Sequence, residues 1–133
     1  MRVLVAEDDA RTREGLQTIL EGEGYDVVCA RDGGQALEMF GNATFDFVLL
    51  DIMMPRLNGY DVCRAIRKAN AAVPVVFISA KSEEIDKVLG LELGADDFIS
   101  KPFGVREVVA RMRAITRRSM RGRVDEDGLR DFG

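Results

Sequence analysis

The chain contains no histidine. This absence excludes catalytic triads built on histidine, zinc sites with histidine ligands, and a phosphohistidine carried by the chain itself. Cysteine is scarce, and we expect the two examples, Cys29 and Cys63, to be reduced core residues. No apolar run approaches the roughly 18 residues of a membrane span, and Met1–Ala6 is too short for a signal-peptide core. The chain is therefore expected to be cytoplasmic, without contact with a membrane.

The composition is that of a folded protein. Of the 133 residues, 47% are hydrophobic and 32% are charged, which fits one globular domain rather than a disordered segment. The formal net charge of -4 gives no general attraction to nucleic acid or to anionic lipid. Arginines nevertheless gather near the C-terminal end, where we expect them to serve a protein interface and a linker rather than bind DNA. They are Arg111, Arg113, Arg117, Arg118, Arg121 and Arg123.

Short apolar stretches alternate with segments of helical periodicity. Apolar stretches without internal alternation are typical of strands buried on both faces of a parallel sheet. The expected strands are Val3–Ala6, Tyr25–Ala30, Phe45–Asp51, Val75–Ile78 and Asp97–Ser100. Helices are expected from Ala10 to Glu21, after Asp32-Gly33-Gly34, around Val62–Ala69, from Glu83 to Leu93 and from near Val105. This order predicts an α/β fold, a flavodoxin-like doubly wound five-stranded parallel sheet (order 2-1-3-4-5) with five helices.

The expected helix from Glu83 to Leu93 carries three apolar residues at helical spacing. They are Ile85, Val88 and Leu89. A stripe of this kind usually packs against the core. We therefore expect these three side chains to be buried.

Polar residues stand where the expected strands end. Glu7 and Asp8 follow the first strand, Asp51 ends the third, Ser79 follows the fourth and Lys101 follows the fifth. The carboxyl ends of parallel strands share one edge of a sheet, so these groups should converge there. Taken singly, each has a simpler interpretation as a helix cap, a turn former or a solvated lysine. Asp9, for example, is expected to cap the following helix.

Convergence of these groups predicts phosphoryl-transfer chemistry. Carboxylates without histidine or thiolate favour a hard cation, and Mg²⁺ is usually held by one or two carboxylates together with phosphate and water. An aspartate beside such an ion can act as a nucleophile toward phosphorus. Lys101 and Ser79 could then stabilise the phosphoryl oxygens. We therefore interpret Asp51 as the centre of the site.

Four segments resemble the receiver domain of two-component response regulators. They are Val3–Asp9, Val48–Pro55 with Gly59, Ile78–Ala80 and Gly94–Phe103, and their order and spacing match over about residues 1 to 118. The resemblance implies that Asp51 accepts a phosphoryl group from a sensor histidine kinase. It also implies Mg²⁺ bound by Asp8, Asp51 and the Met53 backbone carbonyl, with Glu7 acting through water.

The resemblance further implies a switch and a dimer. Ser79 and Phe98 match the switch pair, with phenylalanine where the family often has tyrosine, and the Lys101–Pro102 bond is expected to be cis. Charged residues resemble the two-fold dimer face of winged-helix (OmpR/PhoB-like) regulators, formed by the fourth helix, fifth strand and fifth helix. Intermolecular pairs such as Lys87 with Glu107 and Asp97 with Arg111 are implied; a solvated face is the alternative. The set is Lys87, Glu92, Asp96, Asp97, Glu107, Arg111, Arg113 and Arg118.

The expected organisation is a receiver domain over residues 1–118 and a linker over 119–133. The linker would lead to an absent C-terminal domain, through which alone the protein would bind DNA and control transcription. A stand-alone receiver acting by protein contacts and a phosphorylation-independent receiver-like module remain alternatives. We do not expect an enzyme, because a Mg²⁺-dependent phosphatase would need a second acid where Met53 stands.

Overall fold

The fold is described from a computed structural model of the chain. It describes residues 1–80 and 84–132, and the side chains of residues 1–80 and 88–118. The strands are β1 (Arg2–Ala6), β2 (Asp26–Ala30), β3 (Phe47–Asp51), β4 (Val75–Ser79) and β5 (Asp97–Ser100). The helices are α1 (Ala10–Gly22), α2 (Gly33–Asn42), α3 (Gly59–Ala69), α4 (Glu84–Glu92) and α5 (Val105–Phe132). All strand pairs are parallel and the order is β2-β1-β3-β4-β5, which confirms the predicted fold.

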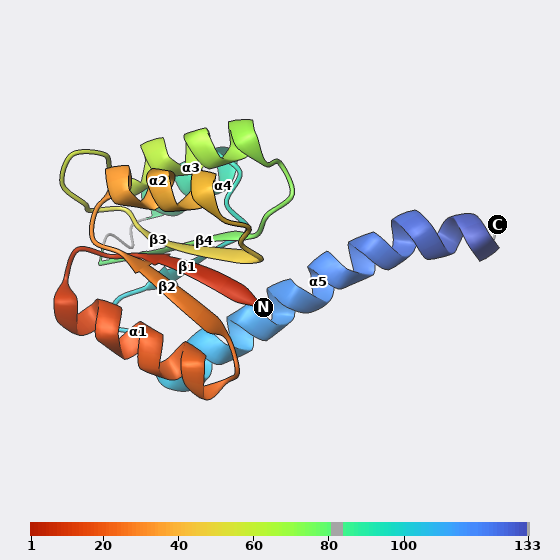
Figure 1. The fold of residues 1–133 in the computed structure, drawn as a ribbon, viewed down its shortest axis with the longest axis horizontal. Helices are drawn as coiled ribbons and strands as arrows, with labels where there is room; N and C mark the ends of the chain where they lie inside the picture. The colour runs from red at the N-terminus through yellow and green to blue at the C-terminus, as the bar shows by residue number, and fades with distance from the viewer. Residues whose placement is uncertain (81–83, 133) are drawn as a thin grey trace.

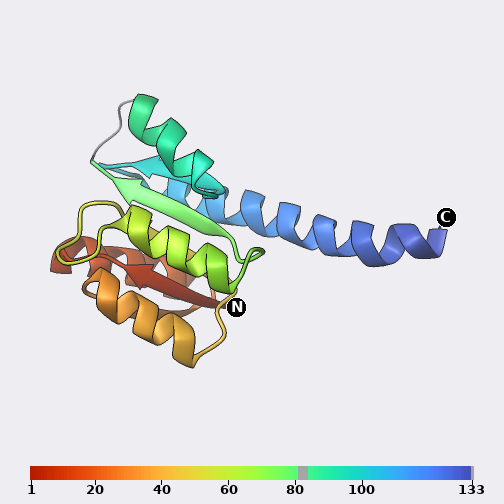
Figure 2. The ribbon, with the colours of Figure 1, turned by 90° about the horizontal axis from the view of Figure 1, so that it is seen from above.

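The sheet separates two helical layers. Helices α1 and α5 cover one face, and α2, α3 and α4 cover the other (Figures 1 and 2). Alternate residues of the central strands point to opposite faces. Accordingly, Val5 and Leu49 pack with α1 and α5, whereas Leu4 and Leu50 pack in the opposite layer. The uniformly apolar strands therefore supply both cores at once.

Three helices begin at a side-chain cap, as their sequences favour. Asp9 accepts a hydrogen bond from the backbone N–H of Thr12 at 2.9 Å, which confirms its expected capping role. Asp32 accepts from the backbone N–H of Gln35 at 2.8 Å at the start of α2. Asn58 caps α3. These caps place each helix directly after the loop that leaves the carboxyl edge of the sheet.

Helix α4 differs from the sequence prediction. Val88 and Leu89 are 47% and 40% exposed, so the expectation that they are buried was wrong; the side chain of Ile85 lies outside the described residues. The helix instead contacts the sheet through Gly90, where an added Cβ would lie 2.9 Å from the Phe77 ring. Because Gly90 has no side chain, the helix backbone packs directly on Phe77, and the nearby Val88 and Leu89 face solvent.

Helix α5 extends beyond Arg118, where the sequence pattern suggested that helical structure ends. The backbone stays helical to Phe132, and Figure 1 shows this helix leaving the body of the domain. Arginine and methionine favour this extension, whereas Gly122 and Gly128 oppose it. A linker function for residues 119–133 is compatible with a helix and stays a prediction.

The two cysteines are free, as expected. Cys63 is fully buried and Cys29 is half-buried. Within the part of the chain that the structure describes, no helix has the length and apolar character needed to cross a lipid bilayer.

Candidate functional site

The carboxyl edge of the sheet brings together side chains from separate strands. Ala6 pairs with Leu50, and Asp51 pairs with Ile78, so the ends of β1, β3 and β4 lie side by side. Glu7 follows β1 directly, and Asp51 is the last residue of β3. Both carboxylates are nearly inaccessible to solvent, at 1% and 4% exposure. This burial is unusual for acids and requires compensation by a cation or by hydrogen bonds.

Lys101 supplies one compensating charge. It follows β5 through the Lys101–Pro102 peptide bond, which is cis as the family resemblance implied. Its Nζ donates to Glu7 Oε1 and lies 3.3 Å from Asp51 Oδ2. The other Asp51 oxygen, Oδ1, accepts from the backbone N–H of Met53 at 3.2 Å. One lysine therefore links the acids at the ends of β1 and β3.

The site contains two buried acids, Glu7 and Asp51, and one lysine, Lys101, which alter the pKa values of Glu7 and Lys101. Burial raises the pKa of Glu7 to about 8, the Asp51 carboxylate acts in the same direction, and Lys101 opposes them. Burial also lowers the pKa of Lys101, but its hydrogen bond to Glu7 and the charge of Asp51 outweigh that effect and raise the pKa above its usual value. One ammonium group is therefore shared between two buried acids.

The donor set suits a divalent cation. Carboxylate oxygens of Glu7, Asp8 and Asp51 lie within 4.8 Å of one another. Glu7 Oε2 is buried and has no hydrogen-bond partner among the described residues, although its chemistry demands one. Asp8 is exposed and gives the cluster access to solvent. This cluster could hold a metal ion, and oxygen ligands of this kind match Mg²⁺.

The loop after β3 is fixed tightly against its surroundings. The Ile52 carbonyl accepts from the backbone N–H groups of both Met54 and Gly59, at 3.2 and 2.9 Å. A Cβ at residue 59 would lie 2.4 Å from the Asp51 carbonyl oxygen, and one at residue 33 would lie 2.3 Å from that of Leu57. Glycine is required at both contacts, so the loop that carries Met53 is held by β3 and by the start of α2.

Of the expected switch pair, Ser79 is the last residue of β4, and Phe98 is the second residue of β5, where it pairs with Phe77. Ser79 is fully buried and Phe98 nearly so. The Phe98 ring centroid lies 6.5 Å from that of Phe77, which in turn meets Tyr60 edge-on at 5.5 Å. Gly90 of α4 lies against this aromatic row. Sequence reasoning missed the row because Tyr60, Phe77 and Gly90 are far apart along the chain.

Several of the residues expected at a dimer face form ion pairs within the single chain. Arg111 pairs with Asp97 at 2.9 Å and with Glu107 at 3.3 Å. Arg113 pairs with Glu23 at the end of α1. An intermolecular pair between Asp97 and Arg111 would therefore have to replace or extend an existing contact. Glu92 is exposed, and the side chain of Lys87 lies outside the described residues.

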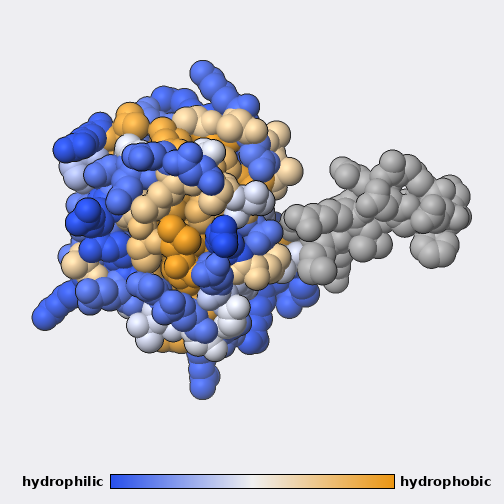
Figure 3. All heavy atoms as spheres, viewed as in Figure 1, coloured by the Kyte–Doolittle hydropathy of each residue, from blue (hydrophilic) through white to orange (hydrophobic). Residues whose placement is uncertain are grey.

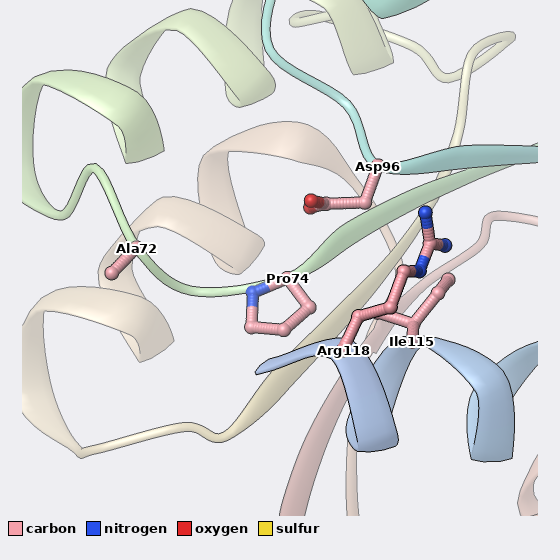
Figure 4. A pocket seen from close by; sticks show the side chains of 5 residues that line it. All are labelled: Ala72, Pro74, Asp96, Ile115 and Arg118. Carbon is pink, nitrogen blue, oxygen red and sulfur yellow. The ribbon is translucent and has the colours of Figure 1, made fainter. Parts of the chain in front are cut away.

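Asp96 lies at the opposite end of β5 from the acidic cluster. Its carboxylate accepts from Arg67 at 3.1 Å and from the backbone N–H of Val75 at 2.8 Å. Arg67 also donates to the carbonyl groups of Gly94 and Val73, a role that the sequence did not reveal. Figure 4 shows Asp96 and Arg118 lining a small pocket there with Pro74.

The surface also carries apolar areas away from the acidic edge. Helix α4 exposes Val88, Leu89 and Leu91. A hollow of about 270 Å³ lies beside the edge strand β2, lined in part by Val28, Met39 and Phe45. In the view of Figure 3, hydrophobic surface lies near the middle of the domain and is surrounded by hydrophilic side chains.

The chain is similar to known proteins both in sequence and in structure. The sequence model of the response regulator receiver domain matches residues 3–113. The DNA-binding response regulator MtrA of Mycobacterium leprae is 51% identical over 118 residues, which cover 89% of this chain and 52% of MtrA. The alkaline phosphatase synthesis transcriptional regulatory protein SphR of Synechococcus elongatus is 47% identical over 127 residues, covering 89% of this chain and 49% of SphR. The chain thus spans about half the length of these relatives.

Solved structures match the whole fold. The receiver domain of the Francisella response regulator 1452 superimposes with a TM-score of 0.83 at 35% identity, covering 89% of this chain and 98% of that one. A CheY-like receiver domain protein of Methanospirillum hungatei gives a TM-score of 0.87 at 26% identity, covering 91% and 97% of the two chains. The agreement of sequence, fold and strand order leads to one conclusion: the chain belongs to the response regulator receiver domain family.

Proposed function

We propose that this receiver domain works as a phosphorylation-controlled switch with Asp51 as the phosphoryl acceptor. The observation that carries the proposal is the geometry around that carboxylate. Asp51 ends β3 on the acidic edge, one oxygen faces Lys101 Nζ at 3.3 Å, and the other is oriented by the Met53 N–H at 3.2 Å. A buried carboxylate fixed in this way is positioned for nucleophilic attack.

The phosphoryl donor is a phosphohistidine of a sensor histidine kinase. An Asp51 oxygen forms a bond to phosphorus while the bond from phosphorus to the donor nitrogen breaks, and the leaving imidazole keeps that electron pair. Lys101 stabilises a phosphoryl oxygen as negative charge gathers there. Since this chain has no histidine, the donor must come from a partner.

Mg²⁺ is the cofactor of this proposal. Asp8, Asp51 and the Met53 backbone carbonyl would hold it, and Glu7 would assist through water. When bound, the ion offsets the negative charge of the carboxylates and of the phosphoryl group. The partnerless Glu7 Oε2 and the carboxylate cluster support this assignment.

Phosphorylation is then transmitted by Ser79 and Phe98. The Ser79 hydroxyl moves toward the phosphoryl group, and the Phe98 ring turns into the space that this movement vacates. Because phenylalanine has no hydroxyl, a switch signal passed by a tyrosine hydrogen bond from this position is absent. The neighbouring Phe77 ring and Gly90 of α4 support a packing route from this pair to the helix surface.

The output is a homodimer through α4, β5 and α5. The exposed apolar residues Val88, Leu89 and Leu91 support this surface, because neighbouring exposed apolar side chains often mark a site of protein interaction. MtrA and SphR are named as a DNA-binding regulator and a transcriptional regulator, and this chain covers half of each. We infer that dimerisation here controls transcription through a DNA-binding domain that follows the receiver.

Intact-mass spectrometry tests the acceptor. Wild type and Asp51→Asn are incubated with a small phosphodonor, with and without Mg²⁺, and the products are then sized. We expect one phosphoryl adduct that requires Mg²⁺, is absent from Asp51→Asn and accompanies dimer formation. An unmodified wild type would contradict the acceptor role and favour a phosphorylation-independent interaction module.

A further inference from the structure

Arg56 has an unusual backbone conformation beside the acidic edge. Its φ is 70°, and among the described residues it is the one non-glycine with a positive φ. This left-handed region is strained for a side chain with a Cβ but not for glycine. A strained residue next to a reacting group raises the question of what its side chain contributes there.

The surrounding loop prevents this strain from relaxing. Hydrogen bonds from Met54 and Gly59 to the Ile52 carbonyl close the loop on both sides of Arg56. Gly59 abuts the Asp51 backbone, and Leu57 abuts Gly33 of α2. The backbone at residue 56 is therefore set by its neighbours, and Arg56 is held within the loop that leaves Asp51.

The Arg56 side chain is exposed and makes no hydrogen bond or ion pair with any described residue. Two other cations at this edge are engaged: Lys101 contacts Glu7 and Asp51, and Arg13 donates to the carbonyl groups of Glu7 and Asp8. The acids at the edge repel any anion that approaches. A phosphoryl donor is such an anion, and Arg56 offers it an unpaired positive charge.

We propose that Arg56 is a positioning residue for phosphoryl transfer, whose guanidinium group attracts the anionic phosphoryl donor toward Asp51. The proposal rests on the proposed function of Asp51 as acceptor. The attraction depends on charge at Arg56, falls with ionic strength, and grows with the negative charge of the donor. This attraction acts at a distance and does not require the guanidinium group to contact the reacting atoms.

The test compares phosphorylation rates at saturating Mg²⁺ by intact-mass spectrometry. With acetyl phosphate at low ionic strength, we expect Arg56→Gly to react about threefold more slowly than wild type and Arg56→Glu about tenfold more slowly, as Coulomb energies across ~10 Å of water indicate. Arg56→Lys should keep the wild-type rate. High salt should reduce all differences to below about 1.5-fold, because screening is then nearly complete. Phosphoramidate, which carries about half the negative charge of acetyl phosphate at neutral pH, should show smaller differences.

Two controls separate charge from structure. Arg117→Gln removes an exposed charge from α5, far along the helix from the acidic edge, and should keep the wild-type rate. Arg56→Gly relieves the backbone strain, so its unfolding midpoint should equal or exceed that of wild type. A slower rate in a variant that folds at least as well cannot be ascribed to a damaged fold.

Three results would overturn the proposal. They are a wild-type rate for Arg56→Gly in low salt, a loss of rate in Arg56→Lys as large as that in Arg56→Gly, and a loss of the same size in high salt. In each case wild type still gains its adduct at Asp51, and the proposed function stands. If wild type itself gains no adduct, both proposals fail together.

Discussion

Individual buried residues show how the fold controls reactivity. Burial raises the pKa of both thiols, that of Cys63 and that of Cys29. A higher pKa leaves less thiolate at neutral pH, and thiolate is the reactive form. Cys63 is in addition fully buried, whereas Cys29 is partly accessible.

Alkylation should distinguish the two cysteines. In the folded protein at neutral pH, we expect iodoacetamide to modify Cys29 slowly and Cys63 hardly at all. Both should react rapidly after unfolding, and a higher pH should speed the reaction of Cys29. Peptide mass mapping over time measures both rates. Equal rates in the folded state would contradict the described burial.

At the scale of elements, helix α2 depends strongly on its cap. Its first residues are Gly33 and Gly34, which have poor helix propensity. Asp32 accepts from Gln35 N–H, and the Gln35 side chain accepts from Arg31 N–H at 2.7 Å. This reciprocal arrangement resembles a capping box and offsets the weak first turn.

Removing this cap should destabilise the domain. We expect Asp32→Ala to lower the free energy of unfolding by about 1 kcal/mol, while Asp32→Ser should retain most of the stability. Chemical denaturation measures the difference. As a control, Glu38→Ala changes an exposed residue of the same helix and should have little effect. If Asp32→Ala has the same free energy of unfolding as wild type, the cap does not contribute to the stability of the domain.

Helix α4 packs closely against the sheet at Gly90, where there is no room for a side chain. A Cβ there would lie 2.9 Å from the Phe77 ring, and α1 contains Gly15, where a Cβ would meet nothing within 4 Å. We expect Gly90→Ala to destabilise by roughly 1 to 3 kcal/mol through overpacking. Gly15→Ala should instead stabilise by up to about 1 kcal/mol. Thermal and chemical unfolding of the pair provide the measurement, and equal shifts would argue against close packing at Gly90.

These elements also show what a sequence can and cannot predict. Runs such as Phe47–Asp51 predicted the buried strands correctly, because a parallel sheet covered on both faces tolerates little else. The same topology predicted that Glu7, Asp8, Asp51 and Lys101 would meet. The exposure of Val88 could not be predicted, because apolar periodicity does not reveal whether the partner is the sheet or another molecule. The left-handed Arg56 was also hidden, since its loop is held in part by the contact of Leu57 with Gly33, which is distant in sequence.

At the scale of the whole molecule, the apolar surface of α4 tests the proposed dimer. Val88 is exposed on α4, and Val105 is 58% exposed at the start of α5, beside Glu23 of α1. We expect Val88→Ser to weaken dimerisation of the phosphorylated protein about tenfold, through apolar area lost on both copies. Val105→Ser, the same chemical change on the side of α5 that lies beside Glu23 of α1, should leave dimerisation intact. Analytical ultracentrifugation measures both. Equal dimerisation of Val88→Ser and wild type would reject this face.

The sheet that divides the two helical layers has a further consequence. Side chains such as Leu16 and Met112 pack on one side of it, and Val62 and Ile66 pack on the other. Substitutions that share no partner usually have additive effects on stability, to within about 0.5 kcal/mol. The layer that holds the α1–α5 ion pair can therefore accumulate changes almost independently of the layer that holds Phe77 and Phe98. Substitutions in one layer should therefore constrain those in the other mainly at the acidic edge, which is built from loops that lead into both layers.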